Sequence, residues 1–168
     1  NHCSVGLFHY AKGSLERAID IARSHLDFFS FTGHARWHDM PIMPNDGHLL
    51  WQEGFEHHTR CWPETKRLMA AANQDGEFVA YPGYEWHSAR YGDRSVVFPD
   101  DDCDLYTPDT IEELVAYART KGALLIPHHI GYKSGLPGRG ANWESIDDEA
   151  MSLLEIYSEH GGHERDRG

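Results

Sequence analysis

The sequence predicts an α/β fold with a largely parallel sheet, because helix-like and strand-like segments alternate along the chain. Apolar residues recur at helical spacing over 14–24 and again after Thr107-Pro108. Short aromatic or branched runs follow each of these segments, at 26–32 and at 123–127. The length of 168 residues suits a single domain, spanning 1–168.

Caps, glycines and prolines set the expected boundaries. Ser14 caps the first helix, and Pro63 is expected to begin a new helix because proline is favoured at the first helical position. In order, we expect a helix over 14–24, a strand over 26–32, a loop over 39–47, helices over 48–61 and 63–73, a strand from 78 through 86, a strand over 95–98, an acidic loop over 99–106, a helix over 107–121, a strand over 123–127, a glycine-rich loop over 131–140 and a last strand over 151–157.

Composition excludes several classes of function. A formal net charge of −12 argues against a nucleic-acid partner, which requires clustered Lys and Arg. No apolar stretch approaches the roughly 20 residues of a membrane helix, and no signal segment stands out. Cys3, Cys61 and Cys103 form no C-x-x-C pair, so we expect free thiols in a reducing compartment, with the cytoplasm favoured.

Histidine is unusually frequent, with 13 in the chain, and several copies follow predicted strands. The carboxyl ends of strands form the rim where α/β active sites lie, so we expect these side chains to converge there. Neutral imidazole is the commonest metal ligand, and carboxylates complete such sites. The expected metal ligands are His2, His9, His34, Glu85, His128, Glu155 and His160.

This donor set suits manganese, zinc or iron better than calcium, which prefers oxygen ligands alone. Two or three such ions would activate a water molecule and stabilise an anionic transition state, as in the hydrolysis of a phosphate or other ester. We expect His129 to bind metal, contact substrate or transfer protons, and Arg94 and Lys133 to bind an anionic small molecule. The chain has no G-x-S-x-G segment, which argues against a serine hydrolase.

The remaining candidates have weaker signals. His87 could orient a ligand from outside the metal shell, and Arg90 and Arg139 join the basic residues near the rim. His57 and His58 lie within a predicted helix and are expected to be solvated. Structural roles are expected for His25, His48 and His163, whereas His38 or Asp39 could supply a donor near His34.

The order of these motifs resembles that of the PHP (polymerase and histidinol phosphatase) superfamily, in an uncharacterised branch. Asn1-His2-Cys3-Ser4 resembles the second half of the opening His-x-His motif, and Thr32-Gly33-His34 resembles Thr-Asp-His. The other similar segments are Pro82-Gly83-Tyr84-Glu85-Trp86, whose Glu would bridge metals, Ile126-Pro127-His128-His129, and Leu154-Glu155-Ile156-Tyr157. The resemblance implies a distorted β/α barrel, here partial, with a two- or three-metal hydrolytic site.

Two departures from the family pattern leave an alternative open. Gly33 stands where the second motif has Asp, and Arg94 lies about where another histidine is expected. The first His of the opening motif and the closing Asp-x-His motif are missing, so we expect a fragment truncated at both ends. A non-catalytic metal-binding or interaction domain is therefore the main alternative. A mononuclear iron oxygenase is disfavoured because its usual jelly-roll fold lacks the alternating helices.

Overall fold

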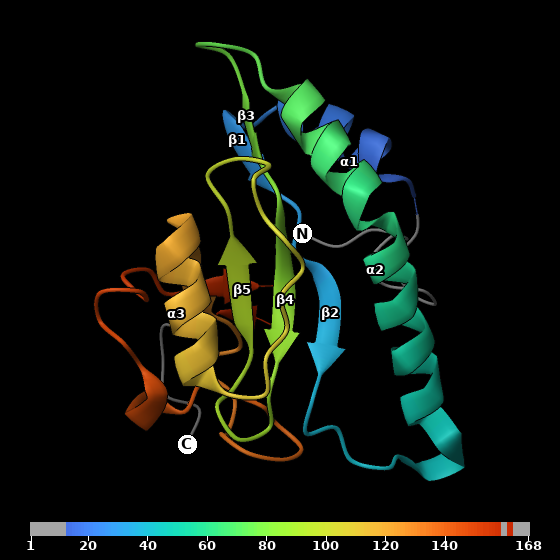
Figure 1. The fold of residues 1–168 in the computed structure, drawn as a ribbon, viewed down its shortest axis with the longest axis vertical. Coiled ribbons are helices and arrows are strands. Elements are labelled where there is room, and N and C mark those ends of the chain that lie inside the picture. Colours follow the sequence, from blue (N-terminus) through green and yellow to red (C-terminus); the bar gives the residue numbers. More distant parts are fainter. Residues whose placement is uncertain (1–12, 159–160, 163–168) are drawn as a thin grey trace.

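The computed structural model describes residues 13–158, 161 and 162, which form a mixed α/β fold (Figure 1). Its elements are α1 (Leu15–Arg23), β1 (Phe28–Ser30), β2 (Gly33–Trp37), the 3-10 turn η1 (Pro44–Asp46), α2 (Gly47–Ala72), β3 (Val79–Tyr81), β4 (Gly83–His87), β5 (Arg94–Val97), α3 (Ile111–Lys121), β6 (Leu124–Pro127), the 3-10 turn η2 (Trp143–Ser145), β7 (Tyr157–Ser158) and β8 (Gly161–Gly162). The predicted alternation of helices and strands is confirmed.

The main sheet has four strands in the order β2-β4-β5-β6. β2 is parallel to β4, whereas β5 is antiparallel to both β4 and β6. Strands β2, β4 and β6 therefore share one direction, and their carboxyl ends lie at the same edge. The prediction of a largely parallel sheet is wrong for β5, which returns from β4 through a short turn. In a separate two-stranded sheet, β1 pairs with β3 in parallel. The described strands do not close into a barrel.

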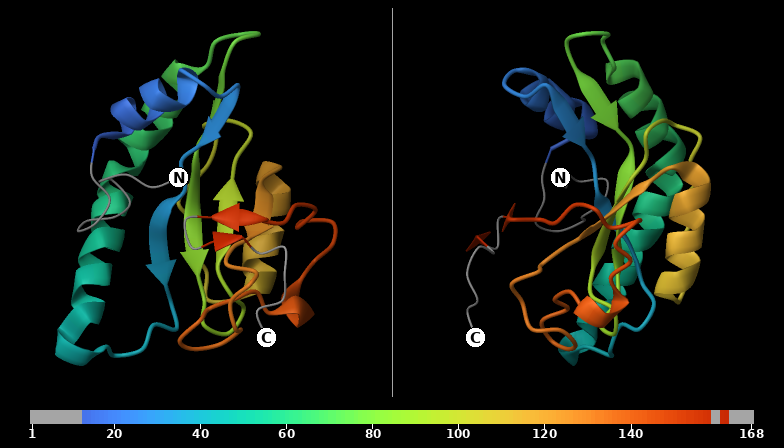
Figure 2. Two further views of the ribbon diagram at one scale, coloured as in Figure 1. Left: turned by 180° about the vertical axis from the view of Figure 1, so that it is seen from behind. Right: turned by 90° about the vertical axis from the view of Figure 1, so that its left-hand side faces the viewer.

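The two faces of this sheet carry different side chains because successive strand residues alternate. Tyr84, Val96 and Leu125 lie in one cross-strand row, are almost wholly buried and belong to the main hydrophobic core. That core also takes Leu114 and Ala118 from α3. Glu85 and His87 point to the other face. Figure 2 shows α3 on one side of the sheet, with β7 and β8 on the opposite side.

Helix α2 is one continuous helix and not the two that the sequence predicted. Pro63 lies inside it, although an interior proline costs about 3 kcal/mol. Apolar packing on both sides of Pro63 offsets this cost: Phe55 and Trp62 are buried before it, and Met69 after it. Met69 belongs to a second core cluster, formed with α1 and β1. No helix in the described part of the chain combines the length and apolar content needed to cross a membrane.

Two other expected elements differ from the structure. Helix α3 begins after Thr110 and not at Thr107-Pro108, because the Thr110 hydroxyl accepts a hydrogen bond from the Glu113 amide and donates one to the Glu113 carboxylate. The carbonyl of Pro108 instead accepts a hydrogen bond from the Trp86 indole. The strand expected over 151–157 is wrong except at its end, since 151–156 have no regular structure.

Candidate metal centre

The pairing of β2 with β4 brings the first ligands together. His34 lies directly opposite Glu85, and Trp37 lies opposite His87. The register shifts by one residue between His34 and Arg36, and such a bulge changes the direction of nearby side chains. His34 lies within β2, whereas the sequence had placed it at a strand end. The sheet itself therefore positions these side chains.

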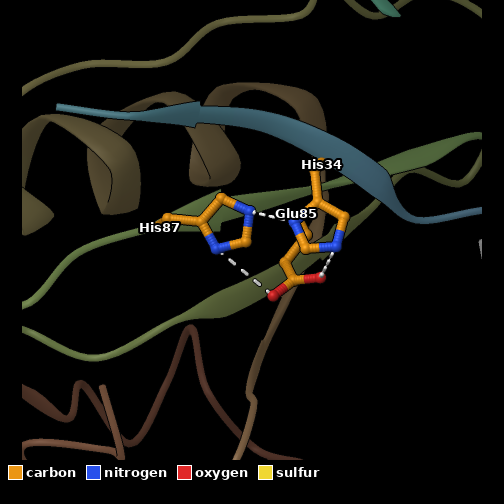
Figure 3. Close-up of side chains that lie close together, drawn as sticks. All are labelled: His34, Glu85 and His87. Carbon is orange, nitrogen blue, oxygen red and sulfur yellow. Dashed lines mark hydrogen bonds and ion pairs between the residues drawn. The ribbon is translucent and has the colours of Figure 1, made fainter. Parts of the chain in front are cut away.

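His34, Glu85 and His87 form the first group that could hold a metal ion (Figure 3). His34 Nδ1 is 2.6 Å from His87 Nε2, and His87 Nδ1 is 3.3 Å from Glu85 Oε1. His34 Nε2 is 3.9 Å from Glu85 Oε2. The side chains of Glu85 and His87 are 1% and 0% exposed, so this polar group lies wholly inside the protein.

Glu85 also belongs to a second group, with His128 and His129 at the end of β6. His128 Nε2 is 3.7 Å from Glu85 Oε1. The imidazole rings of His128 and His129 lie side by side, with their centroids 3.6 Å apart. Glu85 is common to both groups, so its carboxylate would lie between two ions if each group held one.

Glu155 orients the second group. Its Oε1 is 2.8 Å from His128 Nδ1, and its Oε2 accepts a hydrogen bond from the backbone N–H of His129. This arrangement turns His128 Nε2 toward Glu85. Carboxylates that bind the far nitrogen of a metal-ligating histidine fix its ring and its tautomer. The predicted convergence of Glu155 with His128 is therefore found. Glu155 contacts Nδ1 of the His128 ring, the nitrogen that faces away from Glu85.

Asp93 and Arg139 complete the cluster, and of the two only Arg139 was named from the sequence. Asp93 Oδ2 is 3.2 Å from His87 Nδ1, 4.0 Å from His129 Nε2 and 2.6 Å from Arg139 Nη1. Asp93 follows Gly92 at the turn into β5, where an ordinary turn residue has the same sequence signature. Arg139 was one of several basic residues near the rim.

His58 supports β2 from α2 and is not solvated, so that expectation was wrong. Its side chain is fully buried, and its Nδ1 donates to the carbonyl oxygen of His34 at 2.9 Å. Its ring also packs edge-on against Phe31 and Trp62. A helical position alone did not reveal this role, because which helix face is buried depends on how α2 packs against the sheet.

The electrostatics of His128 reflect competing effects. Burial lowers the pKa of His128, but Glu85, Glu155 and Asp93 together raise it above its ordinary value. A proton and a divalent cation satisfy the same carboxylates and compete for the same imidazole nitrogen. The cluster therefore attracts positive charge, which is the property that a metal site requires.

The other expected catalytic residues lie outside the cluster. Arg94 pairs with Trp86, so its side chain is on the core face of the sheet, opposite to Glu85. Its guanidinium binds the carbonyl oxygen of Asp93 and the hydroxyl of Ser145, and burial lowers the pKa of Arg94 to about 10. A substrate-binding role for Arg94 is therefore corrected to a structural one. Lys133 is exposed, and no contact in the described part of the chain joins its side chain to the cluster.

Asp39 organises the neighbouring turn and does not compensate for Gly33. Its carboxylate accepts hydrogen bonds from the Ser88 hydroxyl and from the amides of Ala89 and Arg90. Burial raises the pKa of Asp39, but these hydrogen bonds outweigh that effect and lower it. Three expected ligands, His2, His9 and His160, lie outside the described residues.

The donors fit a transition metal or zinc, with one geometric condition. Two nitrogens on one tetrahedral ion lie about 3.3 Å apart, given bonds of about 2.0–2.1 Å. The 2.6 Å between His34 Nδ1 and His87 Nε2 is shorter and describes a hydrogen bond between the rings. His34 Nε2, which faces Glu85, is able to bind an ion in the tautomer in which His34 Nδ1 carries the ring proton and donates it to His87 Nε2.

Comparison with known proteins adds no assignment. No family model matches the chain, and no curated protein gives a significant match.

Proposed function

We propose that the chain is a metal-dependent hydrolase, acting on phosphoesters or related anionic esters, with divalent ions held around Glu85. The observation that carries this proposal is the position of Glu85, a buried carboxylate shared by two histidine groups. Burying a carboxylate is costly unless it is paired or bound to metal. Imidazole and carboxylate together are the ligands that manganese, iron and zinc accept.

The charge balance of the cluster supports the same proposal. Asp93, Glu85 and Glu155 are carboxylates, and among the described residues Arg139 is the guanidinium that forms an ion pair with one of these carboxylate groups. With neutral imidazoles, this group carries about two formal negative charges. One divalent ion would neutralise it, and further ligands from the chain would allow a second.

When bound, such ions lower the pKa of a coordinated water to near neutrality and stabilise negative charge on a transferring group. The residues of the chain supply the rest. Glu155 holds His128 toward Glu85, and His87 with His58 fixes the ring and backbone of His34. His129 lies beside His128 and is placed to accept or donate a proton at the reacting centre.

The resemblance to the PHP superfamily supports the reaction class. His34, Glu85, His128 and Glu155 come from four segments that resemble family motifs, and the fold brings all four to one place. A partial barrel of that type agrees with β2, β4 and β6 sharing a direction. We propose membership on these grounds.

Metal analysis of the purified protein, combined with a phosphoesterase assay, tests the proposal. We expect bound manganese, iron or zinc, hydrolysis of an aryl phosphate or phosphodiester, loss of turnover after chelation, and recovery when metal is restored. His128→Ala should remove both metal and turnover. His25→Ala is the matched control, because His25 is exposed, its ring contacts Ser24, and it belongs to neither group around Glu85. A His128→Ala protein that retains its metal would contradict the assignment.

A non-catalytic metal-binding domain is the second candidate, and Gly33 is the observation that favours it. Gly33 is buried within β2 and supplies no carboxylate where the family motif has one. This candidate predicts a stable metal complex with no turnover of any ester tested. The same two measurements therefore separate it from the enzyme.

A further inference from the structure

We propose that the Arg139 guanidinium occupies the part of the cluster formed by Asp93, His87 and His129, here called the Asp93 corner, and excludes a metal ion from it. This inference depends on the proposed metal centre and specifies where its ions bind. Divalent ions would then be confined to the positions around Glu85, and the guanidinium would supply the positive charge at Asp93.

The donors at this corner would otherwise suit a metal. Asp93 Oδ2 lies 3.2 Å from His87 Nδ1 and 4.0 Å from His129 Nε2, and its carboxylate is 0% exposed. A buried carboxylate beside two imidazole nitrogens is the kind of donor set that binds zinc or iron. The corner therefore needs a cation of some kind.

Arg139 already provides that cation. Its Nη1 is 2.6 Å from Asp93 Oδ2 and 2.9 Å from His87 Nδ1, so it contacts two of the same three donors. Its guanidinium also stacks over the Trp37 ring, with 4.4 Å from Cζ to the ring centroid. Arginine stays protonated at every physiological pH, so this positive charge does not depend on metal supply.

The backbone holds Arg139 in this position. Its φ of 56° lies in the left-handed region, which costs a non-glycine residue about 1 kcal/mol or more. Its amide donates to the Gly135 carbonyl at 2.7 Å, and its carbonyl accepts from the Asp93 amide at 3.4 Å. At Gly92 a Cβ atom would lie 2.5 Å from the carbonyl oxygen of Gly140, so the two loops touch backbone to backbone.

Backbone hydrogen bonds on both sides of Arg139 thus place its Cα beside the Asp93 turn. Left-handed backbone at a charged residue persists only where surrounding structure fixes it. Here the loop over 132–142 packs against the turn over 88–93, and both carry one partner of the same ion pair. The turn carries Asp93 and the loop carries Arg139, and the two side chains form the ion pair between them.

Metal stoichiometry tests the inference with three variants. Arg139→Met removes the charge but keeps the contact with Trp37, and it should bind one more equivalent of zinc or manganese than the unaltered protein. Arg139→Lys retains a cation and should keep the original number. Arg90→Met is the matched control, because Arg90 is exposed and lies on the facing turn. Element analysis after dialysis against a fixed free metal concentration gives the counts.

Asp93→Asn supplies a readout that does not need the Arg139 variants to fold. If Arg139 excludes metal at this corner, Asp93 is no metal ligand and the count stays unchanged in Asp93→Asn. A loss of one equivalent in Asp93→Asn, or no gain in a folded Arg139→Met protein, overturns the inference. Absence of metal from the unaltered protein would instead refute the proposed metal centre itself.

Discussion

Replacing Glu85 by Gln removes one negative charge from the centre of the cluster and changes little in shape. A divalent ion placed among these donors lies within about 4 Å of the carboxylate, where unit charges attract by about 4 kcal/mol at an effective dielectric constant of about 20. For a dication the attraction is about 8 kcal/mol. Relief of the buried charge in the metal-free state offsets part of this, and we take that part as about half.

The remaining 4 kcal/mol or so corresponds to roughly 1000-fold weaker metal binding, since about 1.4 kcal/mol is tenfold. Competition with a chelating dye measures the dissociation constant in both proteins. Glu144→Gln is the matched control, because Glu144 is exposed and its substitution removes the same charge from the surface of the protein. If folded Glu85→Gln protein bound zinc within tenfold of the unaltered protein, the bridging role of Glu85 would be refuted.

Three further predictions concern stability. Leu114→Ala should lower the free energy of unfolding by about 2–5 kcal/mol in urea titrations, because Leu114 is fully buried, whereas Leu49→Ala on an exposed position should change it by about 0.5 kcal/mol or less. Gly92→Ala should lower the free energy of unfolding more than Gly76→Ala does. Both glycines have positive φ, but only at Gly92 would a Cβ atom collide with the facing loop. Equal losses of stability would contradict the close contact between the two loops. Neighbouring carboxylates outweigh burial and raise the pKa of His128. Protonation of His128 therefore stabilises the metal-free fold fully below about pH 6.5, and this contribution is lost as pH rises through the raised pKa. His128→Gln should flatten that part of the curve of unfolding free energy against pH.

Sequence patterns predicted the convergence of the candidate ligands that lie on or directly after strands. His34, Glu85 and His128 were expected to meet because they belong to strands with a common direction. The structure brings His34 and His128 each within 4 Å of the Glu85 carboxylate. Glu155 was also expected at the cluster, but on a strand that does not form. Its side chain reaches His128 from irregular backbone, which no strand periodicity could describe.

Sequence reasoning missed Asp93 and did not single out Arg139 from the other basic residues, because contacts between loops place both side chains. Asp93 and Arg139 meet because Gly92 and Gly140 allow two backbones to approach, and such a contact between distant segments leaves no local pattern. His58 was assigned to solvent because helical spacing alone does not state which face packs on β2. Local signals fix elements, whereas these side chains depend on how the elements pack.

The antiparallel direction of β5 adds a carboxylate, Asp93, to the residues that the three strands of common direction supply to the cluster. Strands β2, β4 and β6 direct His34, Glu85 and His128 to one edge, and the turn between β4 and β5 begins and ends at that same edge. Asp93, the last residue of this turn, therefore enters the cluster, and its carbonyl also binds the amide of His128. A second buried carboxylate close to Glu85 would be strongly unfavourable without a counter-charge. The antiparallel strand thus creates the need for a cation that the facing loop meets with Arg139.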